Sequence, residues 1–149
     1  TRQRLMAKMV AWYMDKRTTL CVVSHYYEEL DQLADKILIL EAGQVVDFGN
    51  KDDLFRKYCG RTVITIENNV YNHQLTASMT KLEAPGHLIA LACPTEKDEE
   101  MLTKKLIDEN INYKRSNNDI EIMSINAKAH FFKVAGVKDQ GCRSNEKTA

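Results

Sequence analysis

The stretch TTLCVVSHYYEELDQLADKILIL, residues 18–40, decides how this sequence is interpreted. Residues 18–23 are apolar or β-branched, and the unbroken run LCVV predicts a strand that is covered on both faces, as in a parallel sheet. That run ends abruptly at Ser24 and His25. Because open α/β sheets bind ligands beyond the carboxyl ends of their strands, His25 stands where a ligand would be contacted.

A short helix is predicted directly after this strand, over residues 26–35. Ser24 is suited to cap its N-terminus, and Glu28 and Glu29 fall in its first turn, where carboxylates interact favourably with the helix dipole. Glutamates at such positions are usually solvated. We therefore assign this pair no role as a catalytic base.

The residues on either side of this stretch predict a helix and a hairpin. Residues 1–17 carry apolar side chains at the i, i+3, i+4, i+7 spacing of an amphipathic helix. Two apolar runs, 37–40 and 45–48, flank Ala42-Gly43, which predicts a tight turn between two strands. A further helix is expected over 51–59, capped by Asn50 with Asp53 in a capping box and ended by Gly60.

Beyond Gly60 the pattern changes to that of an α+β domain. Thr95 and Asp98 have the spacing of a capping box, and Met101, Leu102 and Leu106 are expected to face inward. The predicted elements are a half-buried strand over 61–67, a helix over 74–82, a strand over 86–93, a helix over 95–110, a hairpin over 111–125 that turns at Asn117-Asn118, and a helix over 126–134.

Composition sets limits on function. The chain has 149 residues, of which 44% are hydrophobic and 28% charged, as in soluble globular proteins. A formal net charge of zero gives no electrostatic case for a nucleic-acid partner, and no apolar run is long enough to cross a bilayer. Four dispersed cysteines favour reduced, structural thiols in a cytosolic protein over two disulfides, with Cys21 expected in a buried strand. No histidine has the spacing of a metal ligand.

The order of these features resembles the C-terminal end of an ATP-binding-cassette (ABC) transporter ATPase domain. In that family a hydrophobic strand ends in Ser-His and is followed by Glu-Glu, by Ala-Asp with a basic residue, and by a strand–turn–strand that contains Gly. Here these elements are Ser24-His25, Glu28-Glu29, LADKILIL and EAGQVVDFG, within residues 1–58. The resemblance implies that His25 is the catalytic and ATP-contacting residue, with a neutral imidazole that donates a hydrogen bond to the γ-phosphate. The alternative is an ordinary strand-end histidine bonded to a nearby carbonyl.

Other parts of such an ATPase are missing from the sequence. None of the six glycines belongs to a phosphate-binding (Walker A) loop G-x-x-x-x-G-K-[ST], and the glycine-rich signature and the aspartate-rich (Walker B) strand are also absent. We therefore expect a fragment or truncated product that by itself neither binds ATP at micromolar concentration nor hydrolyses it. ATP and Mg²⁺ are expected only in the intact protein.

The predicted fold class is α/β, with a partial P-loop-type nucleotide-binding domain followed by a small α+β accessory domain. The domains are expected over 1–59 and 60–136, with a disordered tail over 137–149. The last helix, INAKAHFFKVAG, resembles the closing segment of ABC-2-type ATPase subunits, although Ala127-Lys128 replaces an acidic pair and Ala135 a threonine. Phe131 and Phe132 fit a helix with one ring in the core and one partly exposed, or a docking patch.

The resemblance implies a transporter subunit in the cytoplasm, peripheral at the inner face of a membrane. Its partners would be a second ATPase domain and transmembrane transporter domains, with no nucleic acid. Two alternatives stay open. One is an ABC ATPase outside transport, which the neutral charge disfavours. The other is a non-catalytic regulatory or interaction module.

Overall fold

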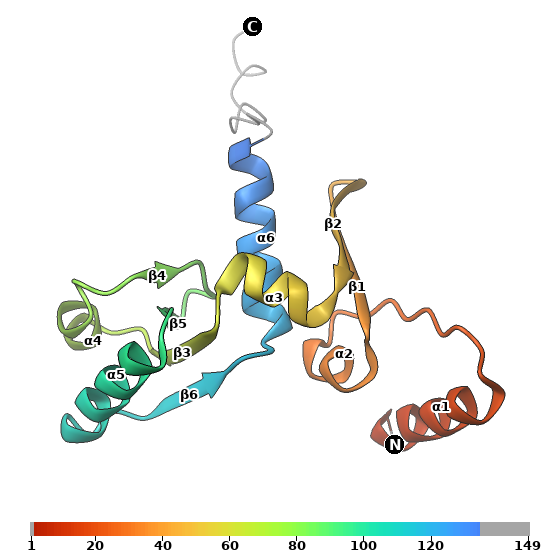
Figure 1. Ribbon diagram of the computed structural model, residues 1–149, viewed down its shortest axis with the longest axis horizontal. Helices are drawn as coiled ribbons and strands as arrows, with labels where there is room; N and C mark the ends of the chain where they lie inside the picture. Colours follow the sequence, from red (N-terminus) through yellow and green to blue (C-terminus); the bar gives the residue numbers. More distant parts are fainter. Residues whose placement is uncertain (1, 135–149) are drawn as a thin grey trace, which may run out of the picture.

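The computed structural model describes residues 2–134, which form a mixed α/β structure with six helices and two antiparallel sheets (Figure 1). The helices are α1 (Arg2–Lys16), α2 (Tyr27–Leu33), α3 (Lys51–Cys59), α4 (Val70–Leu75), α5 (Glu96–Asp108) and α6 (Ile120–Val134). The strands are β1 (Lys36–Glu41), β2 (Gln44–Asn50), β3 (Thr62–Glu67), β4 (Lys81–Leu82), β5 (Leu88–Cys93) and β6 (Tyr113–Ser116).

The predicted hairpin is confirmed as the two-stranded sheet β1–β2. Its loop is Ala42-Gly43, and both residues have positive φ, 49° and 73°, as a type I′ turn requires. Ile37 and Ile39 point into the core, whereas Leu38 and Leu40 lie on the outer face and are more than half exposed. The hairpin is therefore apolar on both faces.

The helix predicted over 51–59 is confirmed, but its predicted cap is not. Gly60, with φ of 81°, ends α3 as expected. Asn50 occupies the N-cap position without a capping bond, because its side-chain amide instead donates to the Asp53 carboxylate at 3.2 Å. Ser24 is likewise not the N-cap of α2. That position is Tyr26, whose backbone N–H donates to Ser24 Oγ at 3.0 Å.

The second sheet has the strand order β4-β5-β3-β6, and its neighbouring strands are antiparallel. The element order from β3 to β6 is β-α-β-β-α-β, the split-βαβ arrangement of ferredoxin-like domains. β3 was predicted to be half-buried, which is wrong, because its residues 62–66 are all buried. Ile64 and Ile66 pack with residues of α5, while Val63 packs with residues of α3 and α6 on the opposite face.

Helix α5 confirms the predicted capping box, since the Thr95 side chain accepts from the Asp98 N–H at 3.1 Å and the Asp98 carboxylate accepts from the Thr95 N–H. Leu102 and Leu106 are buried as expected, but Met101 is 64% exposed, so its predicted inward position is wrong. The helix predicted over 74–82 is also misplaced. It begins earlier, at Val70, because the Asn69 side chain accepts a hydrogen bond from the Asn72 N–H at 2.8 Å.

The hairpin predicted over 111–125 is wrong beyond β6. The IEIMSI segment belongs to α6, which begins at Ile120 rather than at Asn126. Asp119 supports this start by accepting a hydrogen bond from the Ile122 N–H at 3.1 Å. Alternating apolar residues suggested a strand, but Ile120, Met123 and Ala127 are buried at helical spacing.

The predicted parallel strand over 18–23 is not formed. These residues run as an extended link between α1 and α2 (Figure 1), and their exposure alternates, with Leu20 and Val22 half-buried and Cys21 and Val23 exposed. Neither of the two sheets in the described residues includes the segment. A strand needs hydrogen bonds to a neighbouring strand, and the two sheets of the described residues offer this segment none. Cys21 is exposed for the same reason, contrary to prediction.

Two clusters form the core. One unites both predicted domains, since Ile37, Ile39 and Phe55 pack with Val63 and Ala90 of the sheet and with the buried residues of α6. The other lies between the sheet and α5 and contains Ile64, Leu91 and Leu106. In Figure 1, α6 stands beside α3 and the hairpin. The predicted tail over 137–149 lies outside the described residues.

Candidate functional site

His25 lies in the short link between the extended segment 18–23 and α2, and its side chain is exposed. Within residues 2–134 no hydrogen bond or ion pair engages the imidazole, so the bond to a nearby carbonyl that we considered as an alternative is not made. Both ring nitrogens can therefore reach an external ligand.

The residues around His25 fasten α1 to α2. The Arg2 guanidinium lies 3.6 Å from the centroid of the Tyr26 ring, and Arg2 Nε contacts Glu29 Oε1 at 2.6 Å. A second bond joins Arg2 Nη2 to Glu29 Oε2 at 3.1 Å, so the pair is bidentate. Its hydrogen bond to Glu29 raises the pKa of Arg2. Glu29 is thus used in a structural contact, whereas Glu28 is exposed.

Helix α2 is held by apolar packing and by one lysine. Tyr27, Leu30 and Ala34 pack against the first core cluster. Lys51, the first residue of α3, donates its Nζ to the Asp31 carbonyl at 2.7 Å and its backbone N–H to the Asp35 carbonyl at 3.0 Å. These contacts fix the helix that begins two residues after His25.

Among the described residues, Asp31 is the one whose side chain has a buried polar atom without a hydrogen-bond partner. This atom is Oδ1. Burial raises the pKa of the Asp31 carboxyl; nearby Lys51 opposes this rise and Asp119 adds to it. The ionised form therefore weakens the attachment of α2.

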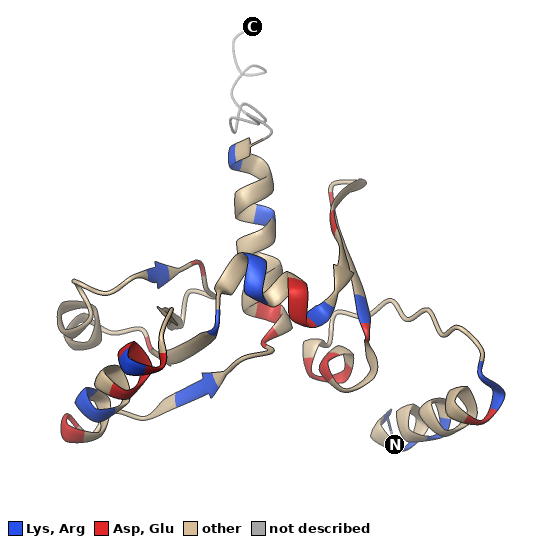
Figure 2. Cartoon of the chain, in the orientation of Figure 1, with Lys and Arg blue, Asp and Glu red and all other residues tan. Residues whose placement is uncertain are grey.

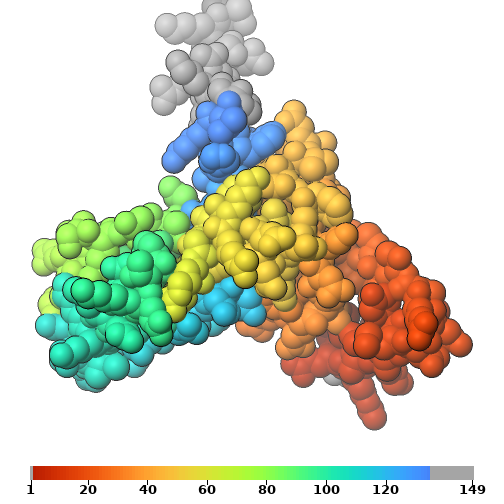
Figure 3. Space-filling view, viewed as in Figure 1, coloured from red at the N-terminus to blue at the C-terminus, as the bar shows by residue number. Residues whose placement is uncertain are grey.

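Exposed apolar side chains surround this region. Val23 is 94% exposed, and α1 contains no buried residue although it carries Trp12 and Met14. On the outer face of the hairpin, Leu38 pairs with Phe48 and Leu40 with Val45 across the strands, and all four side chains are more than half exposed. In the space-filling view α1 forms a corner lobe at the N-terminal end (Figure 3).

A shallow cavity of about 440 Å³ lies between β2 and α3. Asp47 dominates its polar chemistry, because its Oδ2 accepts from Lys57 Nζ at 2.8 Å and from the Tyr58 hydroxyl at 2.5 Å. The bond from Lys57, and then that from Tyr58, lowers the pKa of Asp47. The carboxylate is thereby paired, and the cluster fastens α3 to the hairpin.

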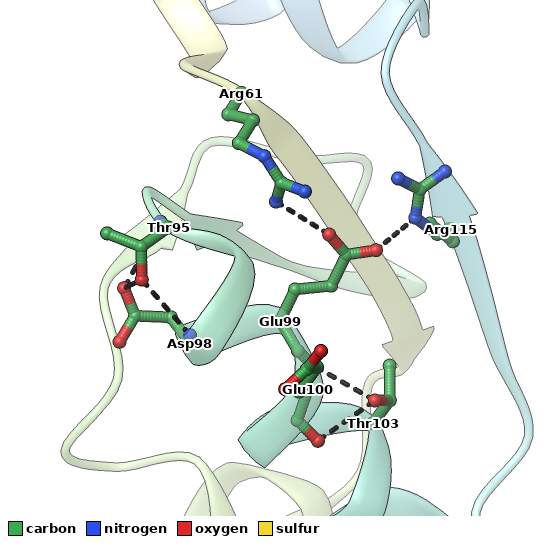
Figure 4. A network of polar contacts seen from close by, with 7 residues as sticks. All are labelled: Arg61, Thr95, Asp98, Glu99, Glu100, Thr103 and Arg115. Atoms are coloured by element: carbon green, nitrogen blue, oxygen red, sulfur yellow. Dashed lines mark hydrogen bonds and ion pairs between the residues drawn. The ribbon is translucent and has the colours of Figure 1, made fainter.

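A second cavity of about 600 Å³ lies where α3 meets the turn between β6 and α6, and it is lined by Arg56, Arg61, Asn117 and Asn118 among others. Arg61 Nη1 contacts Glu99 Oε2 at 2.6 Å, and Arg115 donates to the other oxygen of Glu99 (Figure 4). The bond from Arg115, more than that from Arg61, lowers the pKa of Glu99. Glu99 thus joins α5 to β6 and to the residue that precedes β3.

The described residues offer little other site chemistry. They contain no group of three potential metal ligands among His, Cys, Asp and Glu. Cys59 and Cys93 are buried free thiols, and burial raises the pKa of Cys59 to about 12. His130 packs edge-on against Tyr58. Phe132 is 37% exposed and Phe131 is half-buried, and neither ring belongs to the core clusters of the described residues, so the predicted core position of one ring is wrong.

Charges are interspersed rather than segregated (Figure 2). None of the helices within residues 2–134 has the length and apolar character needed to traverse a bilayer.

The role of His25 stays a prediction, and the sequence analysis missed the residues that hold the helix after it. Arg2, Glu29 and Lys51 make contacts between different elements. Their local spacing in the sequence does not predict such contacts. In comparisons with known proteins, no family model and no curated protein sequence matches this chain.

Proposed function

We propose that this chain is the C-terminal part of an ABC transporter ATPase subunit, in which His25 contacts the γ-phosphate of ATP. The observation that carries the proposal is an exposed imidazole, free of hydrogen bonds within the described residues, at the junction of an extended apolar segment and a helix. The glycine-containing hairpin that the resemblance requires follows at the expected position.

The exposed apolar surfaces support the same proposal. Segment 18–23 is apolar and extended, and it has no strand partner within the described residues. A helix followed by such a segment is the second half of a βαβ unit, in which a parallel neighbour would supply the missing hydrogen bonds. The outer face of the hairpin likewise needs a covering layer. A larger nucleotide-binding sheet would cover both.

The contribution of His25 to the reaction would be positional. Its imidazole would donate one hydrogen bond to a γ-phosphate oxygen and so orient the phosphate towards the attacking water. Mg²⁺, when bound with ATP, neutralises the charge that develops on the phosphates. This chain offers no phosphate-binding loop, so ATP and Mg²⁺ would be held by other parts of the subunit. In that subunit the chain would lie at the cytoplasmic face of a membrane, paired with a second ATPase domain and with transmembrane partners.

The decisive experiment uses a longer polypeptide that carries both this chain and a phosphate-binding loop. His25→Ala should lower kcat by about 10²–10³-fold, the cost of removing one donor from a transition state, with little change in ATP binding. His87→Ala, which removes another exposed histidine, is the matched control and should leave turnover unchanged. Equal turnover in the His25 variant and the wild type would overturn the proposal.

The 149-residue chain itself should show no saturable ATP binding at micromolar concentration by calorimetry, because the principal phosphate contacts are missing. Clear micromolar binding would contradict this assignment. A regulatory or interaction module remains the second candidate function. The exposed apolar hairpin face favours it, since such a surface marks a site where a partner docks.

A further inference from the structure

We propose that helix α6 sets the position of His25, with Ile120, Ile122 and Met123 as positioning residues. The inference rests on the proposed function for its catalytic consequence. Its structural part, that α6 is the platform on which α2 is mounted, can be tested without nucleotide.

The apolar face of α2 packs against α6 in the described structure. Its residues Tyr27, Leu30 and Ala34 pack against the first core cluster, and the α6 members of that cluster are Ile120, Ile122, Met123 and Ala127. Each of these four is at most 2% exposed. Because α2 contributes no fully buried residue, it follows the surface that α6 presents.

His25 is coupled to α2 by chain connectivity. The helix begins at Tyr27, and Tyr26 is its N-cap, so no flexible linker separates the imidazole from the first turn. Helix α2 also makes polar contacts, which are partly exposed. These are the Arg2–Glu29 pair and the Lys51 hydrogen bond to the Asp31 carbonyl. The Arg2–Glu29 pair joins α2 only to α1, which contains no buried residue, so the apolar contact with α6 and the Lys51 bond are what connect α2 to the core.

The same helix links α2 to the four-stranded sheet. Val63 of β3 and Ala90 of β5 belong to the cluster that contains Met123, and α6 begins four residues after β6. A displacement of the sheet therefore reaches α2 through close-packed side chains, because a dense core transmits shifts rather than absorbing them. This is a route by which the region after residue 60 would control phosphate contact.

The two core clusters supply a matched experiment in the 149-residue chain. Met123→Ala opens a cavity in the cluster beneath α2, and Leu106→Ala opens one in the other cluster; both side chains are 0% exposed. NMR should show shifted His25 ring signals for Met123→Ala, with exchange protection of the Leu30 and Ala34 amides lowered about tenfold or more relative to Leu106→Ala. Met123→Leu conserves volume and should restore the wild-type signals.

A milder pair keeps the test valid if either alanine variant does not fold. Ile122→Val and Ile66→Val each remove one methylene, from the first and second cluster respectively, and only Ile122→Val should move the His25 signals. Equal responses within a pair, or no response from His25, would overturn the inference. In the intact ATPase, Met123→Ala should lower kcat with KM for ATP unchanged. Shifted His25 signals in the 149-residue chain, together with no ATPase activity of the longer wild-type polypeptide, would contradict the proposed function while leaving the α2–α6 coupling intact.

Discussion

The region before residue 60 and the sheet that follows it contain similar apolar runs, but the sheet buries its run and the earlier region leaves its run partly exposed. Residues 62–66 of β3 are buried on both faces, between two helical layers and two neighbouring strands. The equally apolar segment 18–23 is extended, and Val23 is 94% exposed. A run of apolar and β-branched residues therefore becomes a buried strand only where other parts of the molecule supply its partners.

The largest expected effect comes from Phe55→Ala. Phe55 is 2% exposed and lies in the cluster shared by the hairpin, the sheet and α6, so its removal should lower the free energy of unfolding by about 3–5 kcal/mol. Because the cluster is shared, hydrogen exchange of the β1 and β3 amides at increasing denaturant concentration separates two outcomes. A single weakened transition for the hairpin and sheet fits a common core, and an unaffected sheet would show that the two regions fold independently.

Two identical substitutions measure the contrast directly. Val63 is 0% exposed and Val23 is 94% exposed. Val63→Ala should cost about 2–3 kcal/mol because two methyl groups leave a packed core, whereas Val23→Ala should change stability by less than about 0.5 kcal/mol. Urea denaturation of both variants provides the measurement. A comparable loss for Val23→Ala would mean that segment 18–23 is packed in solution, for instance against another molecule.

Asp31→Asn tests how charge affects the attachment of α2 to the rest of the chain. Burial raises the pKa of Asp31 in the folded state, so the folded protein holds this proton more tightly than the unfolded chain. The charged groups that act on the carboxyl are Lys51, Asp119, Lys114 and Glu28. The stabilising contribution of the protonated form is complete below the unfolded pKa, about 4, and is lost as pH rises through the folded pKa.

Asp31→Asn should therefore stabilise the chain at pH 7 by about 0.5–1 kcal/mol, a small value because the side chain is only partly buried. The gain should vanish near pH 3. Thermal unfolding at both pH values tests this, with Asp35→Asn, an exposed neighbour, as the control. A gain that persists undiminished at pH 3 would show that charge is not its cause.

The smallest effect is expected in the sheet. Glu99→Gln removes two ion pairs, to Arg61 and Arg115, at the protein surface. Those bonds lower the pKa of Glu99, so its contribution is present above the unfolded pKa and is lost as pH falls through the folded pKa. The variant should lose at most about 1 kcal/mol at pH 7 and less in high salt. A salt-independent loss would argue for packing instead.

Local chemistry accounts for the parts of the fold that the sequence predicts well. Ala42-Gly43 specifies its turn through two positive φ angles, and Thr95 with Asp98 specifies the start of α5 through reciprocal bonds. The failures involve distant partners. Segment 18–23 needs a neighbouring strand, and IEIMSI alternates like a strand but is drawn into a helix by Asp119 and by core contacts far along the chain.

The candidate site divides in the same way. The motif around His25 is what leads to the proposal for this imidazole, because an apolar run followed by a helix start is a local signal. The contacts that mount it are not local. Arg2 meets Glu29 across 27 residues, and Lys51 meets Asp31 across 20, so only the folded chain brings them together.

The shared cluster also fixes the order in which the chain matures during synthesis. Ile37 and Ile39 leave the ribosome about ninety residues before Ala127, yet they are buried against the helix that contains it. The hairpin can form early from its own turn and pack on α3, but the cluster that covers its inner face is incomplete until α6 has emerged. During that interval the nascent chain exposes a hairpin with apolar side chains on both faces. Chaperones bind surfaces of this kind.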